Sequence, residues 1–228
     1  MSMKPILFNT EMVRAILDGR KSCTRRIVKP QQLVGLLPDK CKSGVPEEFL
    51  KEKKFMFKPY CDMTDIELIN TAYKAPYQPG DILYVRETWQ YLYELDGNEQ
   101  VIEDTGKYYY AATDTIPFNT YVDENGVRHD HAPWRPSIHM PKEAARIWLK
   151  VTDVRVERLQ EITTNQIEQE GVETEYPHVL NGEEKKYAFQ NLWNSTIKKS
   201  DLDFYGWDAN PYVWVIEFER CEKPGSEV

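Results

Sequence analysis

The sequence contains no long hydrophobic run and no recognisable export signal. No window of its 228 residues approaches 18 consecutive apolar residues, which argues against a transmembrane helix. The apolar stretch near the start, residues 6–8, is too short for the hydrophobic segment of a secretory signal. We therefore expect a cytoplasmic protein that has no membrane partner.

Cysteine and metal-binding motifs are also scarce. The spacings of the four cysteines match neither a CxxC zinc pair nor a compact disulfide framework, and we expect free thiols at Cys23, Cys41, Cys61 and Cys221. Residues 129–131, His-Asp-His, look like metal ligands, but no second cluster lies at ligand spacing. The chain also lacks a P-loop and the HExxH, GxSxG and dinucleotide-binding motifs. We therefore expect neither a metal nor another cofactor.

The chain is acidic overall but carries one basic segment. Its 29 Lys and Arg stand against 37 Asp and Glu, whereas proteins that hold long duplexes non-specifically are usually basic. The segment GRKSCTRR, residues 19–26, nevertheless gathers one lysine and three arginines. Such a local cluster fits a small anionic ligand, a nucleoside or a short single strand. The 14 Tyr and 6 Trp provide rings that can stack on bases.

The first predicted element is a short helix. Asn9 or Thr10 can cap it, Gly19 ends it, and its apolar face comprises Met12, Val13, Ile16 and Leu17. The basic segment is therefore the exit from a helix, and TRRIV is expected to begin a strand.

Further strands and helices are predicted along the chain. QPGDILYVRETW, residues 78–89, predicts a tight turn followed by a strand, and residues 145–159 are rich in strand-forming residues. A capping box at residues 163–166 predicts a short helix that Gly171 ends. Another helix is expected over residues 188–197, and YVWVIEFERC, residues 212–221, predicts a closing strand.

Two insertions interrupt these elements, at about 30–78 and 93–132. The first is rich in proline and is expected to be loop-rich and to dock on the core through Phe55, Phe57 and Tyr60. The second contains the turn signals Asp96-Gly97 and Asn125-Gly126 and predicts hairpins. Together the elements predict a single α+β domain over residues 1–228, a small mixed β-barrel with short flanking helices.

Four segments in order resemble the ASCH domain family. They are the helix followed by GRKSCTRR, the turn and strand GDILYV, the helix NQIEQEG and the final strand VWVIEFE. The stretches YVRETW, WRPSIHMP and WDANPYVWVIEF are similar to the larger ASCH proteins of phages and prophages. The resemblance covers most of the chain outside the insertions. It implies a PUA-like β-barrel related to RNA-binding domains.

The resemblance also implies a catalytic site. One small bacterial ASCH protein is an amidohydrolase that acts on N4-acetylcytidine through a lysine, a threonine and a glutamate. The pattern G-x-K-x-x-T matches the lysine and threonine to Lys21 and Thr24. The glutamate falls on Glu170, with Glu168 and Glu173 as neighbouring alternatives. Other ASCH proteins are reported as ribonucleases, so the resemblance implies a site more firmly than a reaction.

The chemistry of these residue types fits hydrolysis. A threonine hydroxyl acts as a nucleophile only if a base takes its proton. Lys21 can serve as that base if it is desolvated or crowded by cations, and Arg20, Arg25 and Arg26 can crowd it and bind substrate. The alternative is that the basic residues favour the dipole of the preceding helix and that Thr24 begins a strand.

The segment YVRETW places two substrate-binding candidates after a strand. Trp89 can stack on a base, and Glu87 can accept a hydrogen bond from a base amino group. The alternative is a core tryptophan beside a surface pair of Arg86 and Glu87.

The segment WRPSIHMP supplies two more candidates between prolines. Arg135 can hold a phosphate or carboxylate, and His139 can act as an acid or base near neutral pH. The alternative is a loop whose Trp134 and Met140 plug the end of the barrel.

Three functions follow from these observations. The first is amide hydrolysis of an N4-acylated cytidine-like substrate by a Lys/Thr/Glu site. The second is a non-catalytic reader of modified bases or single-stranded RNA, and the third is a metal-independent ribonuclease. In each case the expected partner is a nucleoside, a modified base or a short single-stranded RNA.

Overall fold

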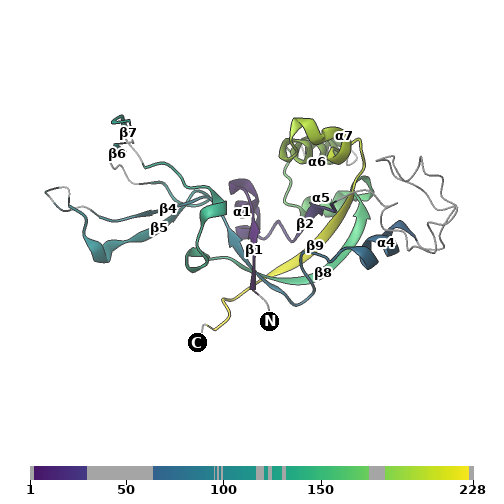
Figure 1. Cartoon of the computed structure of the whole chain (residues 1–228), viewed down its shortest axis with the longest axis horizontal. Coiled ribbons are helices and arrows are strands. Elements are labelled where there is room, and N and C mark those ends of the chain that lie inside the picture. The colour runs from purple at the N-terminus through teal and green to yellow at the C-terminus, as the bar shows by residue number, and fades with distance from the viewer. Residues whose placement is uncertain are drawn as a thin grey trace. The chain divides into compact units, whose positions relative to one another are not determined.

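The computed structural model describes residues 3–29, 64–94, 96, 98, 100–116, 121–122, 125–129, 132–174 and 183–225. The chain divides into two compact units (Figure 1). The first unit comprises Met1–Lys21, Gly80–Lys150 and Glu219–Val228, and the second comprises Ser22–Pro79 and Val151–Phe218. Each unit is described by itself below. Within the ranges given, no helix is long and apolar enough to cross a membrane.

The strands of the first unit run in the order β1-β3-β8. β1 (Met3–Leu7) lies parallel to β3 (Ile82–Arg86), with Met3 opposite Ile82. β3 pairs antiparallel with the start of β8 (Trp148–Arg158). The sequence predicted β3 and β8 but not β1, because β1 is short and contains Pro5. A proline is tolerated in a strand at the edge of a sheet, where β1 lies.

Helix α1 (Thr10–Leu17) confirms the first predicted element. The side chain of Asn9 accepts a hydrogen bond from the backbone N–H of Met12 at 2.9 Å, as an N-cap residue does. Gly19 has φ +76°, a left-handed conformation that glycine adopts without strain, and it ends the helix as predicted. The basic segment therefore begins directly after the capped end of α1.

Antiparallel strand pairs lie in the stretch predicted as the second insertion, as the turn signals there indicated. β4 (Trp89–Leu92) pairs antiparallel with β5 (Lys107–Tyr110), so the pairing begins before the expected boundary at residue 93. β6 (Tyr121–Val122) pairs with β7 (Arg128–His129) around the Asn125-Gly126 turn. Short 3-10 turns at Glu103–Thr105, Ser137–His139 and Lys142–Ala144 connect the elements of this unit. Its core contains Ile82, Trp89, Met140, Ala144, Ala145 and Trp148.

The strands of the second unit run in the order β8-β9-β2. β2 (Cys23–Ile27) pairs antiparallel with β9 (Tyr212–Cys221), and Thr24 lies opposite Ile216. Figure 1 shows β8 and β9 side by side as two long strands. Both β2 and β9 confirm strands predicted from the sequence. The basic segment thus passes directly from the exit of α1 into a strand.

Several helices belong to the described part of the second unit. α5 (Thr164–Gln169) confirms the predicted helix, with the Thr163 hydroxyl accepting from the N–H of Gln166. α6 (Glu183–Thr196) begins before residue 188, the expected start, and is followed by a 3-10 turn and α7 (Leu202–Tyr205). Another 3-10 turn, Leu159–Glu161, precedes α5. Leu159, Ile162, Ile167, Phe189, Trp193, Val213 and Val215 form the core.

Helix α4 (Asp65–Ala72) lies near the end of the segment predicted as the first insertion and was not predicted from the sequence. We expected a loop-rich segment because of its prolines. Thr64 and Glu67 form a capping box, however, which satisfies the first N–H groups of a helix and lets it begin. Phe55, Phe57 and Tyr60 lie outside the described residues.

The fold is mixed α+β with a mostly antiparallel sheet, which confirms the coarse prediction. The strand pairings within the described ranges close no barrel. The single domain with two insertions remains a prediction.

Candidate functional site

Burial singles out a small set of polar side chains. Charged side chains are seldom fully buried unless they are paired. In the part of the chain that the structure describes, the buried polar or charged residues are Lys21, Thr24, Arg25, Glu87, Gln90 and Glu170. All of these except Gln90 are candidates from the sequence. Their burial must be explained by their partners.

Thr24 lies on β2 with its hydroxyl against a guanidinium. Its side chain is buried, and Oγ1 accepts a hydrogen bond from Nη1 of Arg26 at 2.7 Å. The two residues are two positions apart on a strand and therefore share a face. Nη1 of Arg26 also donates to the carbonyl of Arg25 at 3.0 Å, which holds the guanidinium in place. A cation at this distance stabilises negative charge that develops on the hydroxyl oxygen.

Glu170 forms an ion pair with Arg25, the residue before Arg26 on β2. It is the C-cap residue of α5, and its Oε1 accepts from Nη1 of Arg25 at 3.1 Å. Arg25 also contacts Oε2 of Glu157 on β8, with Nη2 at 3.4 Å. Burial lowers the pKa of the Arg26 guanidinium, and the charge of Glu170 partly offsets this effect. We call Thr24, Arg25, Arg26, Glu157 and Glu170 the Thr24–Glu170 cluster.

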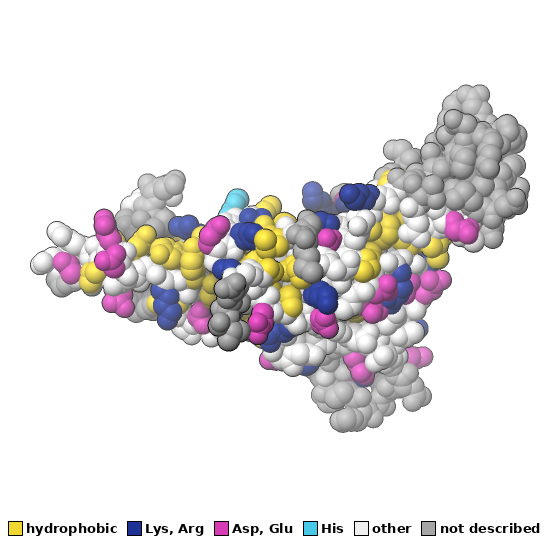
Figure 2. All heavy atoms as spheres, turned by 90° about the horizontal axis from the view of Figure 1, so that it is seen from below, with side chains coloured by type: hydrophobic (Ala, Val, Ile, Leu, Met, Phe, Trp, Pro, Cys, Tyr) yellow, Lys and Arg dark blue, Asp and Glu magenta, His cyan; other side chains and the backbone are white. Residues whose placement is uncertain are grey.

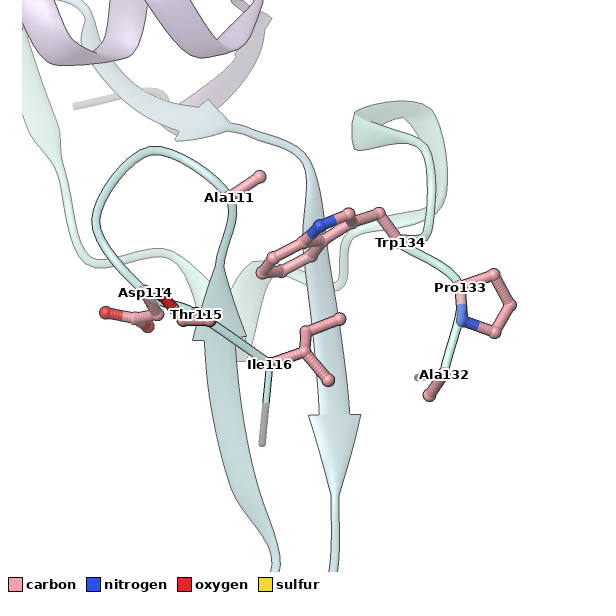
Figure 3. A pocket seen from close by; sticks show the side chains of 7 residues that line it. All are labelled: Ala111, Asp114, Thr115, Ile116, Ala132, Pro133 and Trp134. Carbon is pink, nitrogen blue, oxygen red and sulfur yellow. The ribbon is translucent and has the colours of Figure 1, made fainter. Parts of the chain in front are cut away.

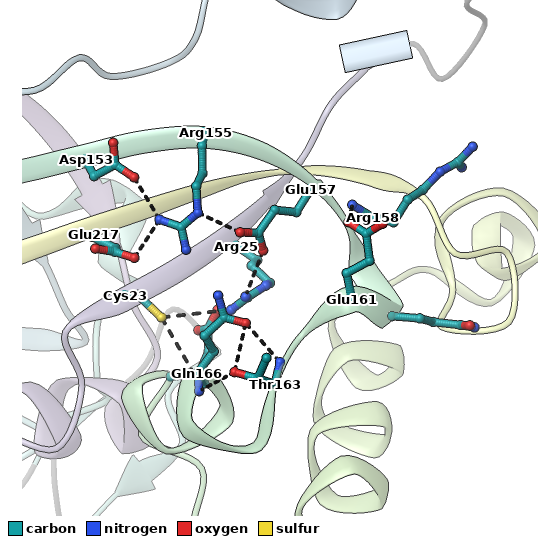
Figure 4. A network of polar contacts seen from close by, with 12 residues as sticks. Cys23, Arg25, Asp153, Arg155, Glu157, Arg158, Glu161, Thr163, Gln166 and Glu217 are labelled. Atoms are coloured by element: carbon teal, nitrogen blue, oxygen red, sulfur yellow. Dashed lines mark hydrogen bonds and ion pairs between the residues drawn. The ribbon is translucent and has the colours of Figure 1, made fainter. Parts of the chain in front are cut away.

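A chain of ion pairs extends from this cluster along the sheet (Figure 4). Nε of Arg155 donates to Oε1 of Glu157 at 2.6 Å, so Glu157 bridges Arg155 and Arg25. Arg155 also contacts Asp153 at 2.7 Å and Glu217 at 2.5 Å. Burial lowers the pKa of Arg155, but hydrogen bonds to these carboxylates outweigh it and raise the pKa above its usual value.

Sequence reasoning missed this chain of ion pairs. The available signal was the alternation Asp153-x-Arg155-x-Glu157, which places three charged side chains on one face of a strand. The partner Glu217 lies on a different strand. Nothing in the local sequence links it to Arg155.

Lys21 and Arg20 follow α1 and belong to the first unit. Lys21 is buried, its Nζ lies 5.5 Å from the centre of the Phe8 ring, and its N–H donates to the carbonyl of Ala15. Arg20 forms an ion pair with Asp18 at 2.9 Å. The structure therefore gives the two predicted residues different surroundings, a buried amine and a surface ion pair.

Glu87 lies in the first unit with an arginine that the sequence did not indicate. Both carboxylate oxygens accept from Arg146, each at 2.9 Å, and the Arg146 guanidinium stacks 4.0 Å from the centre of the Tyr110 ring. The alternative of a surface pair between Glu87 and Arg86 is wrong, because Arg86 donates to the carbonyl of Met140 and Glu87 is buried. Both oxygens of Glu87 therefore already have a charged donor.

Trp89 packs inside the first unit. Only 5% of its surface is exposed, and it belongs to the core cluster with Met140. This burial favours the core interpretation over stacking on a base. The guanidinium of Arg135 lies 5.2 Å from the centre of the Trp89 ring. The backbone N–H of each of these two residues also donates to the carbonyl of the other.

The remaining candidates of WRPSIHMP are more accessible. Arg135 is exposed, and His139 is exposed at the end of a 3-10 turn. Met140 is fully buried, as the plug interpretation expected, but Trp134 is only half-buried and lines a cavity. The role of Trp134 as a plug at the end of a barrel therefore remains a prediction.

The residues that resembled metal ligands form no cluster in the described part of the chain. No group of three or more His, Cys, Asp or Glu lies there at metal-binding distance. His129 is exposed on β7, while Asp130 and His131 lie outside the described residues. Cys23 and Cys221 are free thiols, and Cys41 and Cys61 also lie outside the described residues.

The surface carries mixed charge. On the face shown in Figure 2, Lys and Arg side chains are interspersed with Asp and Glu. Arg25 of the basic segment is buried and Arg20 is paired, so these residues do not form an open basic patch. The segment is therefore suited to a local site better than to gripping a long duplex.

The chain matches no protein-family model, no curated protein and no solved structure. The resemblance to ASCH proteins therefore stays a prediction from the sequence. The Thr24–Glu170 cluster is the strongest structural guide to function.

Proposed function

We propose that the chain is an ASCH-type protein that hydrolyses the amide of an N4-acylated cytidine-like substrate. The observation that carries the proposal is the buried Thr24 hydroxyl, held 2.7 Å from the Arg26 guanidinium. A buried hydroxyl beside a fixed cation is suited to nucleophilic attack, because the cation stabilises the alkoxide. A PUA-like barrel, built on the antiparallel sheet, is part of this proposal.

Each residue has a defined role in the proposed reaction. Oγ1 of Thr24 attacks the acyl carbonyl, and the amine of Lys21 takes the hydroxyl proton. The bond between the acyl carbon and N4 breaks, and N4 receives the proton with the help of Glu170. Water then releases the acyl group from Thr24 as a carboxylic acid, so substrate and water yield cytidine and acid. The role of Lys21 rests on the sequence motif.

The experiment is to incubate the protein with N4-acetylcytidine and to follow cytidine release by chromatography. We expect release by the native protein and none by Lys21→Ala, Thr24→Val or Glu170→Gln. Thr152→Val is the matched control, because Thr152 is an exposed threonine on a strand of the same unit. No release by folded native protein, or full release by all three variants, would refute the proposal.

A second candidate is a non-catalytic reader of a modified base or single-stranded RNA. Arg25 favours it, because its buried Nε–H has no hydrogen-bond partner among the described residues. Buried donors are normally satisfied, and a ligand can supply the missing acceptor. A reader would show salt-dependent binding that Arg25→Gln weakens, with no product.

The third candidate, a metal-independent ribonuclease, differs in its product. It would use the same cationic cluster to stabilise charge on a phosphate group. Cleavage of single-stranded RNA in the presence of a chelator would identify it. If the RNA stays intact under those conditions and cytidine is released from N4-acetylcytidine, the ribonuclease is excluded and amide hydrolysis is supported.

A further inference from the structure

The first unit contains a cavity that the proposed reaction does not use. Its volume is about 450 Å³, within the range of roughly 300–1,000 Å³ typical of small-molecule sites. Its walls include Asp114, Thr115, Ile116, Ala132, Pro133 and Trp134. Asp114, Thr115 and Ile116 follow β5, whereas Ala132, Pro133 and Trp134 lead into the segment WRPSIHMP. None of them belongs to the Thr24–Glu170 cluster.

One aromatic ring dominates the cavity. In Figure 3 the indole of Trp134 points from the Pro133–Trp134 segment toward the loop that carries Asp114, Thr115 and Ile116. Trp134 is half-buried, whereas the side chain of Ile116 is 6% exposed and forms an apolar wall. A planar ring that enters this cavity can stack on the indole and exclude water from it.

A fixed carboxylate supplies polarity. Oδ2 of Asp114 accepts from the N–H of Tyr110 at 2.9 Å, and Oδ1 accepts from the Thr113 hydroxyl at 3.0 Å. These bonds hold the carboxylate while leaving further lone pairs on both oxygens. A carboxylate accepts hydrogen bonds and cannot donate them when ionised. It therefore favours a base that carries an exocyclic amino group, such as cytosine.

One exposed arginine follows the tryptophan of the cavity in the chain, and its guanidinium lies 5.2 Å from the centre of the Trp89 ring. Arg14 forms an ion pair with Glu11, and Arg146 forms one with Glu87. Arg135, which follows Trp134 directly, is exposed and forms no ion pair with the described residues. Arginine suits phosphate because its planar fork can donate two parallel hydrogen bonds. The cavity thus combines an aromatic ring with a carboxylate, and an exposed guanidinium belongs to the residue that follows Trp134 in the chain.

We propose that this cavity binds a nucleotide whose base carries an amino group, with the base on Trp134 and the phosphate on Arg135. The proposal goes beyond amide hydrolysis and does not depend on it. The nucleotide is either free in solution or part of a single strand.

The experiment is calorimetric titration of the full chain with CMP, UMP, cytidine and a cytidylate pentamer. We expect CMP to bind more tightly than UMP, which lacks the amino group, and more tightly than cytidine, which lacks the phosphate. Trp134→Leu should weaken CMP binding by about 5- to 150-fold, the range measured for loss of one base stack. Arg135→Gln should reduce CMP affinity to that of cytidine and flatten its salt dependence.

Controls separate binding from folding. Ile138→Ala is the matched control, because Ile138 is 59% exposed in the neighbouring 3-10 turn and does not line the cavity. It should leave CMP affinity unchanged. Arg135 is exposed, so Arg135→Gln tests the site even if Trp134→Leu proves poorly folded.

The pentamer distinguishes the two sources of the nucleotide. If the protein takes free nucleotides, CMP and the pentamer bind with similar affinity. If it takes a strand, the pentamer binds at least about 10-fold more tightly, and Trp134→Leu weakens both ligands. Absence of CMP and pentamer binding at about 1 mM, or affinities unaffected by both Trp134→Leu and Arg135→Gln, would overturn the proposal.

Discussion

Glu87 in the first unit and Glu170 in the second are both buried carboxylates paired with arginine, yet the pairs are built differently. Glu87 uses both oxygens on Arg146, at 2.9 Å each, and Arg146 is 28% exposed. Glu170 contacts Arg25 at 3.1 Å, and Arg25 is 1% exposed and shared with Glu157. The Glu87–Arg146 pair, in which both carboxylate oxygens are hydrogen-bonded and the arginine reaches solvent, stabilises the fold. A shared and fully buried arginine is costly to keep and is therefore the better candidate for function.

The hydrogen bonds of the two guanidinium groups support this distinction. Nε of Arg146 donates to Glu87, whereas Nε of Arg25 is buried and has no partner within the described ranges. Leaving a buried donor unsatisfied costs about 1–3 kcal/mol. Costs of this kind are concentrated at binding and catalytic sites, where a ligand or a reaction requires the group.

Thr24→Val tests whether the second unit carries the reaction, and we expect it to have the largest effect on cytidine release. Valine keeps the shape of the side chain and removes the hydroxyl, so cytidine release from N4-acetylcytidine should fall at least about 10³-fold, equivalent to about 4 kcal/mol. Nη1 of Arg26 keeps its bond to the carbonyl of Arg25, so the fold should persist. The rate is measured by chromatography beside Thr152→Val. A loss below 10-fold would remove Thr24 from the reaction.

Replacing each glutamate by alanine compares the two pairs directly. Glu170→Ala should lower the free energy of unfolding by about 3 kcal/mol, because Arg25 stays buried with a weaker partner. Glu87→Ala should cost less, about 2 kcal/mol, since Arg146 can regain water. Urea denaturation measures both values. Glu219→Ala, which breaks an exposed pair with Lys150, should change stability by less than about 0.5 kcal/mol. A larger loss for Glu87→Ala than for Glu170→Ala would reverse our interpretation.

Arg155→Gln tests whether the chain of ion pairs supports the second unit. We expect the free energy of unfolding at neutral pH to fall by about 1.5 kcal/mol, because Asp153, Glu157 and Glu217 would be left close together without their cation. Urea denaturation gives this value, and Arg20→Gln, which breaks a surface ion pair with Asp18, serves as control. Equal effects of the two substitutions would show that the chain of ion pairs adds nothing.

The smallest expected effect is an alkaline loss of stability at Tyr110, beside the Glu87 pair. Burial raises the pKa of Tyr110 to about 12, although the charge of Arg146 opposes this. The unfolded chain releases the phenol proton near pH 10, so between about pH 10 and 12 the folded state holds more protons and stability falls as the pH rises. Because Tyr110 is partly exposed, we expect a loss of about 1 kcal/mol.

Unfolding by urea at several alkaline pH values checks this prediction. Tyr110→Phe should flatten the slope of stability against pH, whereas Tyr187→Phe, at a residue 65% exposed, should leave it unchanged. The same slope in both variants would assign the alkaline loss to other groups.

Elements with strong local signals were predicted well from the sequence. α1 and α5 each begin at a residue whose side chain caps the helix, and each is followed by a glycine with positive φ, Gly19 and Gly171. The strands β2, β3 and β9 also lie where their patterns predicted them. Predictions failed where the signal was mixed. β1 contains a proline, and α4 has its capping box in a segment that proline content marked as a loop.

The candidate site was predicted only in part. Lys21, Thr24, Arg25, Glu87 and Glu170 were named from the sequence, and the structure buries all five. Their partners Arg146, Glu157 and Arg155 were not named. Arg25 and Glu170 are 145 positions apart, and no local pattern connects groups at that separation. Trp134 was interpreted as a plug at the end of the barrel, and its cavity became visible only from the arrangement of residues 111–116 around it.

The sequence by itself determined the class of the fold, the start and end of its capped helices and the short list of residues that can carry chemistry. These features depend on neighbours along the chain, through capping hydrogen bonds and the alternation of strands. Only the tertiary structure decided which charges meet. It joined Glu87 to Arg146 and Glu170 to Arg25, and it left Arg135 exposed. Burial determines these pairs, because a charge removed from water needs a partner nearby in space, and that partner can be distant along the chain.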